Sequence, residues 1–427
     1  MSLIGRFINQ ILPVGSITLI GPGGIRETHG PGGGNHVTVR LHDKRAAFDL
    51  FRNPRLRLGE LYMDGRLTIE DGTILDLLEL IVGAKPWEQG RRKGLGKGKA
   101  GKLASLLRRN PVRKSRSNVA HHYDIGNALY ALFLDDDLQY SCAYFTDPGN
   151  SLEQAQADKK AHIAAKLGLK QGQRVLDIGC GWGGMALYLH KVAGVDVLGV
   201  TLSQEQLKIA RERAAAAGVS DHVKFELIDY RHLEGPFDRI VSVGMFEHVG
   251  AAHYDEFYAK CRELLAEDGV MLLHTIGKLG GAGTPDPFTD KWIFPGYHLP
   301  SLSQMCSSSE KVKMIVSDIE TLRLHYAYTL RHWLERATRS RAKIEKMYDA
   351  RFFRMWEFYL AGGIVMFESG AACNYQVQYV RNRRALPITR DYMLETERRY
   401  RELGATPAPA AKKPRGAGGR KALETTA

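Results

Sequence analysis

Apolar-rich runs and helical patterns alternate along the middle of the chain, which predicts alternating strands and helices. The predicted strands are "RVLDIG" (174–179), "VDVLGVTLS" (195–203), "VKFELID" (223–229), "FDRIVSVG" (237–244) and "GVMLLHTIG" (269–277). Helical segments lie between them, such as "SQEQLKIARERAAAAG" (203–218) and "HYDEFYAKCRELLAEDG" (253–269). This order favours an α/β fold with a doubly wound sheet covered on both faces. Ligands of such sheets bind beyond the carboxyl ends of the strands.

The first 85 residues have a different pattern. Apolar and polar residues alternate in "SITLIGPGG" (16–24) and "HVTVRLHD" (36–43), with glycine-rich turns between them, and "DGTILDLLELIVG" (71–83) has the spacing of a helix. No catalytic constellation is visible in this segment. We therefore expect a small α+β amino-terminal domain over residues 1–85.

Basic residues are concentrated in the segment that follows. Residues 91–116 contain eleven Lys or Arg and no acid, and they form most of an expected linker over 86–118. The linker is either a solvated tether or a contact to an anionic surface, where each basic residue contributes on the order of 1 kcal/mol. The net charge of +13 calls for a polyanionic partner, either nucleic acid or an anionic membrane. The tail over 403–427 is expected to be disordered.

The cysteines and the apolar runs bear on localisation. The five cysteines are odd in number, widely spaced and free of any CxxC pair, which speaks against a disulfide framework and a zinc site. They are Cys142, Cys180, Cys261, Cys306 and Cys373. No apolar run approaches the roughly 18 residues that span a bilayer, and the first residues lack the features of a signal peptide. We expect a cytoplasmic protein without a metal.

A glycine-rich turn closes the first predicted strand of the middle region. "VLDIGCGWGG" (175–184) places Asp177 at the strand end, followed by Gly179, Gly181, Gly183 and Gly184. The glycines allow a sharp turn and close approach to a ligand. The pattern resembles motif I of the S-adenosylmethionine-dependent methyltransferases. A dinucleotide G-x-G-x-x-G also fits from Gly179, but Thr201, rather than an acid, follows the second strand.

Two polar residues follow other predicted strands. Glu247, with His248, lies just past the fourth strand, and His274 ends the fifth. If these strands are neighbours, Glu247 and His274 converge above one sheet edge. For either residue alone, capping or orienting a loop is the alternative, but their co-location favours a functional role.

Seven motifs in order resemble the cyclopropane-fatty-acyl-phospholipid synthase family, including its mycolic acid relatives. Besides the glycine turn they are "YDIGNALYALFLDDDLQYSCAYF" (123–145), "GVTLSQEQ" (199–206), "FEHVG" (246–250), "HTIG" (274–277), "WIFPGYHLPS" (292–301) and "HYAYTLRHW" (325–333). "NPRLRLGELYMDG" (53–65) further resembles the amino-terminal domain of the phospholipid-acting branch. The resemblance covers about residues 118–400. It implies a Rossmann-like class I methyltransferase domain over 119–402 and a lipid-associated amino-terminal domain.

The chemistry of this family transfers a methyl group from S-adenosylmethionine to a cis double bond. The resulting carbocation loses a proton and closes to a cyclopropane, with a bound bicarbonate as the base. Aromatic faces are suited to stabilising such a cation. The resemblance maps the bicarbonate site onto Cys142, Glu247, His274, Ile276 and Tyr326.

The resemblance also implies a role for each of these residues. Cys142 and Ile276 contribute main-chain groups, Glu247 accepts from the bicarbonate O–H, and His274 and Tyr326 donate to its oxygens. Cys142 is then neither a nucleophile nor a metal ligand. The alternative for Cys142 is a small buried residue without a role at the site.

The resemblance likewise implies a set of cofactor-binding residues. They are Tyr140, Ser141, Asp177, Gly179, Gly181, Thr201, Leu202, Gln206, Asp229, Tyr230 and Val243. The chain departs from the family at Gly363, where many members carry a cysteine, so a mechanism requiring a cysteine there is in doubt.

Residues 292–302 and 347–367 are rich in large apolar side chains. Helix packing explains such stripes more often, but an acyl chain must be housed somewhere, and these segments are the best candidates. We expect an enzyme at the inner face of an anionic membrane that cyclopropanates phospholipid acyl chains, as a possible homodimer.

Other functions stay open at this point. One alternative produces methyl- or methylene-branched chains with the same cofactor and lipid. A nucleic-acid methyltransferase is disfavoured, because the positive charge lies in a linker and tail and no RNA-binding signature is present. A descendant that binds without catalysis is disfavoured by the retained bicarbonate positions.

Overall fold

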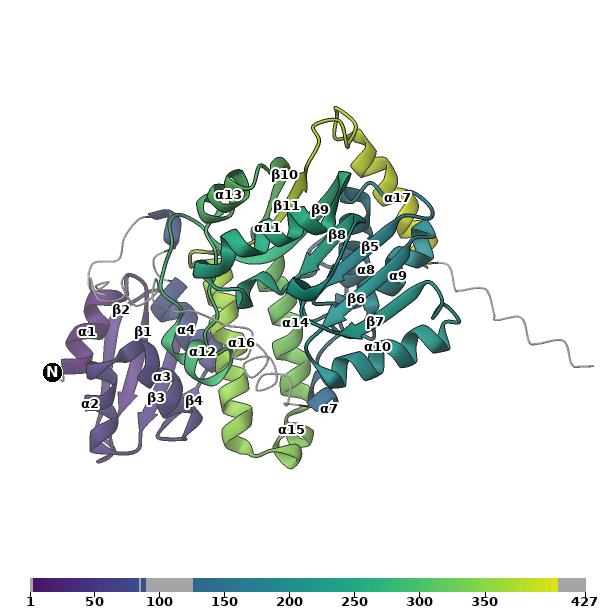
Figure 1. Cartoon of the computed structure of the whole chain (residues 1–427). Helices are drawn as coiled ribbons and strands as arrows, with labels where there is room; N and C mark the ends of the chain where they lie inside the picture. Colours follow the sequence, from purple (N-terminus) through teal and green to yellow (C-terminus); the bar gives the residue numbers. More distant parts are fainter. Residues whose placement is uncertain (1–2, 84–85, 90–125, 406–427) are drawn as a thin grey trace, which may run out of the picture.

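The computed structural model describes residues 3–83, 86–89 and 126–405. Two sheets divide these residues into a small amino-terminal domain and a larger domain, with long helices between them (Figure 1). The predicted basic segment over 91–116 lies outside the described residues. Of the tail predicted to start at residue 403, residues 403–405 form the end of helix α17, and the rest lies outside the described residues.

The amino-terminal domain is built on a four-stranded sheet with the order β2-β1-β3-β4. Its strands are β1 (Gly15–Ile20), β2 (Arg26–Gly32), β3 (His36–Leu41) and β4 (Leu67–Asp71). Its helices are α1 (Leu3–Ile11), α2 (Lys44–Arg52), α3 (Pro54–Met63), α4 (Ile74–Leu78) and the π-helical η1 (Glu79–Gly83), and the 3-10 turn η2 (Trp87–Gln89) follows. The predicted α+β architecture is therefore confirmed. Strands β2 and β4 were not predicted, because glycines and charged residues interrupt their apolar pattern.

The larger domain contains a seven-stranded sheet with the order β10-β11-β9-β8-β5-β6-β7. Its strands are β5 (Arg174–Ile178), β6 (Asp196–Thr201), β7 (Val223–Leu227), β8 (Phe237–Val243), β9 (Leu265–Lys278), β10 (Ile315–Leu322) and β11 (Ala372–Val380). Strands β5 to β9 are parallel, and β10 and β11 are antiparallel. The strand order runs outward from β5 through β6 and β7 on one side and from β8 on the other, so the order switches between β5 and β8. The carboxyl ends of these two parallel strands are therefore the expected ligand site.

Helices flank this sheet and extend from it (Figure 1). They are α7 (Gly126–Tyr130), α8 (Leu152–Lys166), α9 (Gly184–Ala193), α10 (Gln204–Ala216), α11 (Tyr254–Leu264), α12 (Pro287–Trp292), α13 (Leu302–Lys311), α14 (His325–Arg339), α15 (Arg341–Met347), α16 (Ala350–Glu368) and α17 (Asp391–Ala405), with 3-10 turns η3 (Tyr230–His232), η4 (Phe246–His248) and η5 (Ala251–His253). The predicted doubly wound α/β fold is confirmed. The helix predicted over 253–269 is wrong at its end, because Leu265 pairs with Phe237 and begins β9.

The two domains share one hydrophobic core that reaches from the small sheet to α14 and α16. Helix α16 packs against α3, α4 and η1, and α12 packs against α3. The Tyr62 hydroxyl donates to Glu357 over 2.5 Å, and Lys291 forms an ion pair with the buried Glu60 at 2.6 Å. These contacts fix the amino-terminal domain against α12 and α16 of the larger domain. Within the described ranges, none of the helices has the length and apolar character needed to cross a bilayer.

Candidate functional site

The glycine turn after β5 shapes the first part of the site. Gly179 and Gly181 have φ angles of 81° and 53°, a region that favours glycine. The amides of Gly179 and Cys180 both donate to the carbonyl of Val200, over 2.9 and 3.0 Å, and tie the turn to the end of β6. A Cβ atom at Gly179 would come within 2.9 Å of Met245. The turn therefore needs glycine to leave a cavity above the strand ends.

This cavity is lined by all of the residues predicted to bind the cofactor. They are Tyr140, Ser141, Asp177, Gly179, Gly181, Thr201, Leu202, Gln206, Asp229, Tyr230 and Val243. The Thr201 hydroxyl donates to Gln206 over 3.0 Å, and the carboxylate of Asp229 is held by Arg231 at 2.7 Å. The geometry thus brings the whole predicted set together, and their contacts with a cofactor stay a prediction.

Asp177 is the buried acid of this cavity. It is 1% exposed, and its Oδ2 atom has no hydrogen-bond partner among the described residues. Burial raises the pKa of Asp177 to about 7. An orphaned carboxylate oxygen at the cavity wall is suited to a cationic or N–H donor group of a ligand.

Side chains of α8 donate hydrogen bonds to the loop over 139–142, a feature that was not predicted from the sequence. The buried Lys159 donates to Oε1 of Gln139 over 2.6 Å and to Oγ of Ser141 over 2.8 Å. The side-chain amide of Gln156 donates to the carbonyls of the same two loop residues, over 3.1 and 3.0 Å. Burial lowers the pKa of Lys159 to about 7. A lysine on the apolar face of an alanine-rich helix is the signal that could have identified it.

A second, larger cavity is lined by all five residues of the predicted bicarbonate site: Cys142, Glu247, His274, Ile276 and Tyr326. Four residues line both cavities, namely Tyr140, Ser141, Gly244 and His248. As expected, β8 and β9 are neighbours, with Val243 paired to His274. The two cavities therefore meet at the carboxyl ends of these strands.

Glu247 is placed by the 3-10 turn after β8. Its Oε1 accepts from the amide of Ile276 over 2.6 Å, whereas Oε2 is buried and has no partner among the described residues. Burial raises the pKa of Glu247 to about 7, and the Ile276 bond opposes that rise. Glu247 therefore lines the larger cavity and carries one buried oxygen without a hydrogen-bond partner among the described residues.

His274 lies between two amide side chains of β11. Nε2 is 3.1 Å from the amide nitrogen of Asn374, and Nδ1 is 3.1 Å from that of Gln376. Burial holds the pKa of His274 well below its usual range, so the ring is neutral. Because both ring nitrogens have protein partners, donation to a small anion requires one of these amides to turn away. Asn374 and Gln376 were not predicted, since their role depends on the antiparallel pairing of β11 with β9.

Cys142 is buried, and its thiol contacts the neighbouring carbonyl of Ala143 at 3.4 Å. Burial raises the pKa of this thiol above its usual range. A protonated, inward-facing thiol is a poor nucleophile and a poor metal ligand. That Cys142 contributes a main-chain group to a bicarbonate site stays a prediction. The described residues contain no cluster of metal-binding side chains.

Aromatic rings surround the junction of the two cavities. Tyr140 stacks on Trp333 with the ring centroids 5.1 Å apart, and its hydroxyl lies 3.3 Å from that of Tyr359. Tyr326 contacts the edge of Trp333 at 5.8 Å and Phe367 at 4.7 Å. Tyr140, Tyr326, Tyr359 and Phe367 line the larger cavity and can offer their rings to a cation, whereas Trp333 packs behind them, fully buried.

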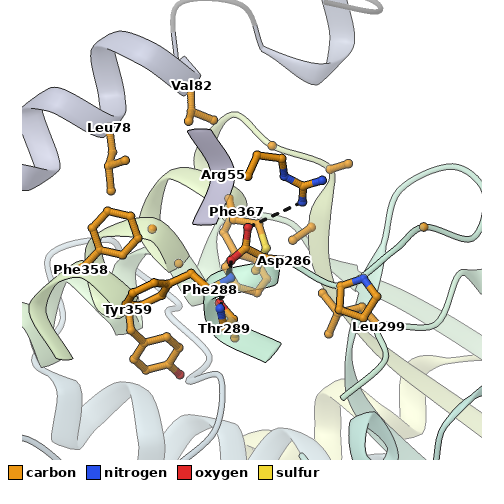
Figure 2. A pocket seen from close by; sticks show the side chains of 18 of the residues that line it. Arg55, Leu78, Val82, Asp286, Phe288, Thr289, Leu299, Phe358, Tyr359 and Phe367 are labelled. Carbon is orange, nitrogen blue, oxygen red and sulfur yellow. Dashed lines mark hydrogen bonds and ion pairs between the residues drawn. The ribbon is translucent and has the colours of Figure 1, made fainter. Parts of the chain in front are cut away.

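The larger cavity has a volume of about 1690 Å³ and extends from this junction into the amino-terminal domain. Figure 2 shows Leu78 of the small domain pointing toward Phe358 of α16 at this cavity, whose wall also includes Val82 and Tyr359. Both apolar segments predicted to house an acyl chain contribute side chains to its wall. Gly363, at the position where many family members have cysteine, also lines it.

Comparison with known proteins places this geometry in context. Residues 111–377 match the profile of the family described as mycolic acid cyclopropane synthetase. A probable fatty acid methyltransferase of Pseudomonas putida is 41% identical over 298 residues, covering 67% of this chain and 75% of the relative. The cyclopropane-fatty-acyl-phospholipid synthase of Escherichia coli K12 is 46% identical over 239 residues, covering 56% of this chain and 61% of the relative.

Solved structures agree with this match. The cyclopropane synthase MmaA2 from Mycobacterium tuberculosis has a TM-score of 0.59 at 31% identity and covers 62% of this chain and 97% of its own. The mycolic acid cyclopropane synthase CmaA1, complexed with SAH and CTAB, has a TM-score of 0.59 at 33% identity, covering the same 62% and 97%.

Proposed function

Because the chain belongs to the mycolic acid cyclopropane synthetase family, we propose that it is a cyclopropane-fatty-acyl-phospholipid synthase. In this reaction the cis double bond of a phospholipid acyl chain gains one CH2 from the methyl group of S-adenosylmethionine. S-adenosylhomocysteine and one proton are released, which balances the reaction. The similarity to the E. coli enzyme of that name supports the assignment.

The observation that carries the proposal is the junction of the two cavities. A smaller cavity at the glycine turn and a large apolar cavity meet at Tyr140, Ser141, Gly244 and His248. A methyl donor in the first cavity and an acyl chain in the second would therefore meet at one point. Such alignment matters because an alkene is a weak nucleophile, and orientation contributes much of the rate.

The residues of the first cavity fit S-adenosylmethionine. The unpaired Oδ2 atom of the buried Asp177 supplies an acceptor for the positively charged portion of the cofactor. The glycine turn allows the protein main chain to approach the cofactor closely. When bound, this cofactor supplies the methyl group. The rings of Tyr140 and Tyr326, which line the larger cavity, stabilise positive charge on the acyl chain, each by about 0.5–2 kcal/mol.

The residues at the second cavity fit a bicarbonate ion. The unmatched Oε2 of Glu247 is an acceptor for its O–H, and the Tyr326 hydroxyl is a donor at the same cavity wall. Bicarbonate would supply the base for the proton that leaves the new methyl group. Glu247 holds the ion in place, and Ile276 fixes Glu247 from the neighbouring strand.

We also place the protein at the inner face of an anionic membrane in the cytoplasm. The net charge of +13 and the basic segment over 91–116 support this placement. A second candidate product is a methyl- or methylene-branched chain, which the probable fatty acid methyltransferase of P. putida favours. The same two cavities would bind the cofactor and the acyl chain in both reactions, because the reactions differ only after methyl transfer.

The test is an assay of purified protein with S-adenosylmethionine, bicarbonate and vesicles of a cis-unsaturated phospholipid. The proposal predicts that S-adenosylhomocysteine forms in step with loss of the alkene. Formation of S-adenosylhomocysteine with the alkene retained supports methylene branching instead. Absence of a lipid product alongside cofactor binding contradicts the proposal.

A further inference from the structure

Helix α2 of the amino-terminal domain carries two large aromatic side chains in solvent. Phe48 is 63% exposed and Phe51 is 66% exposed. They are three residues apart, so they lie on one face of the helix, whereas Ala46 and Asp49 on the opposite side are buried. Exposed phenylalanines this close together are unusual unless they meet a partner.

The same face is basic. Lys44 is exposed next to Phe48, and Arg45 and Arg52 are exposed along one side of the two rings. Asp43 forms an ion pair with Arg66 at 2.7 Å, and Asp49 forms ion pairs with Arg66 at 3.0 Å and with Arg45 at 3.8 Å. The exposed face therefore combines aromatic rings with basic side chains, of which Arg45 is partly balanced by Asp49.

This face continues into the large cavity. Phe51 and Arg52, at the end of α2, line that cavity, and so does Arg55 at the start of α3. Figure 2 shows Arg55 at the cavity wall, where it forms an ion pair with Asp286 at 3.6 Å. A partner lying on α2 would thus be next to an opening of the apolar cavity.

We propose that the face of α2 formed by Lys44, Arg45, Phe48, Phe51 and Arg52 docks on an anionic phospholipid bilayer. This inference rests on the proposed function, and it names the surface through which the substrate is reached. The phenylalanines enter the region between headgroups and acyl chains, and the cations contact phosphate groups. An acyl chain then passes from the leaflet into the cavity beside Phe51.

Charge argues against a second copy of this chain as the occupant. Two copies of the face placed against each other would bring their cations together, whereas an anionic leaflet complements them. The basic segment over 91–116 is excluded as a cover for the same reason, because it carries no acid.

The test uses full-length variants at positions that do not line either cavity: Phe48→Ser, Lys44→Gln and both together. Leu394→Ser is the matched control, since Leu394 is 60% exposed on α17, at the far end of the molecule from α2 (Figure 1). Binding is measured by co-sedimentation with vesicles of phosphatidylglycerol and phosphatidylethanolamine, and with phosphatidylcholine vesicles, at low and high salt.

We expect Phe48→Ser to weaken binding to the anionic vesicles about tenfold or more and Lys44→Gln about fivefold at low salt. Leu394→Ser binds as the wild type does. Turnover of a dispersed short-chain unsaturated phospholipid is unchanged in all variants, whereas turnover of vesicles falls with binding.

Wild-type vesicle binding by the double variant overturns the proposal. Self-association of Phe48→Ser is measured by sedimentation velocity. If self-association changes while vesicle binding stays intact, the face is a contact between copies of the chain, and the proposal is overturned. If the protein modifies no lipid but the variants still lose vesicle binding, the docking surface stands and the proposed function fails.

Discussion

The carboxylate of Glu247 accepts a hydrogen bond from the main-chain amide of Ile276 over 2.6 Å. This bond joins the turn after β8 to the neighbouring strand β9 and fixes one carboxylate oxygen. The other oxygen, Oε2, is buried and has no partner among the described residues. Leaving such an atom unpaired costs about 1–3 kcal/mol, which a bound donor would recover.

The substitution Glu247→Gln tests this arrangement. The amide oxygen of glutamine can still accept from Ile276, but its NH2 group replaces the unpaired acceptor Oε2. We expect turnover to fall by about 100-fold or more, while the affinity for S-adenosylmethionine stays near that of the wild type. Calorimetry and steady-state kinetics measure the two quantities, and Glu263→Gln on the exposed surface is the control. Wild-type turnover would remove Glu247 from the mechanism.

Cys142 provides a second test, because the thiol is protonated and buried. If only its main chain contributes, Cys142→Ala leaves turnover within about twofold of the wild type and abolishes no step. Thiol-specific alkylation of the folded protein is likewise expected to be slow at this residue. A loss of turnover as large as that of Glu247→Gln, in a variant with unchanged thermal stability, would show that the thiol itself takes part.

Lys159 positions the loop that separates the two cavities. Lys159→Met removes the donor to Gln139 and Ser141, so we expect the dissociation constant for S-adenosylmethionine to rise about tenfold or more. A double-mutant cycle with Ser141→Ala measures the coupling, which we expect to be about 0.5–3 kcal/mol. Additive effects would mean that Lys159 does not act through Ser141.

Cofactor affinity is expected to depend on pH. Burial raises the pKa of Asp177 to about 7, so the carboxylate that attracts the cationic cofactor forms as the pH rises through 7. Lys159, whose pKa burial lowers to about 7, loses its positive charge over the same range and acts in the same direction. Affinity should therefore increase from pH 6 to pH 8. Isothermal titration of Asp177→Asn and Lys159→Met separates the two contributions, and a flat wild-type profile would contradict both.

Gly362 on α16 tests the acyl cavity. It lines that cavity, and an added Cβ atom would meet nothing within 4 Å. Gly362→Ala is expected to raise the free energy of unfolding by about 0.5–1 kcal/mol through helix propensity, with activity retained. Gly362→Phe fills the cavity and should lower turnover of long acyl chains more than that of short ones. Equal turnover of long chains by both variants would place the acyl chain elsewhere.

The sequence predicted the strands of the parallel sheet well, because buried parallel strands such as β5 and β8 are short apolar runs. The residues after those strands then followed from topology, so Asp177, Glu247 and His274 could be placed at one edge. The end of the helix predicted over 253–269 was wrong, since pairing of Leu265 with β8 depends on contacts distant in sequence. Strands β2 and β4 were missed for another reason, because glycines and charged residues interrupt their apolar pattern.

The supporting residues of the site were harder to predict. Lys159, Gln156, Asn374 and Gln376 contact the site residues through α8 and β11, and the register of these elements is set by tertiary packing. The contribution of the amino-terminal domain to the cavity wall depends on its docking against α16, which no local pattern encodes.

The central claim is tested most directly with S-adenosylmethionine that carries a trideuteriomethyl group. Purified protein, bicarbonate and vesicles of a cis-unsaturated phospholipid are incubated, and the product is analysed by mass spectrometry together with double-bond-sensitive derivatisation. The account predicts a product that has gained one CD2 unit and no longer contains an alkene, because one deuteron leaves when the ring closes. A product that keeps all three deuterons as a methyl branch, or that retains an alkene, would contradict it.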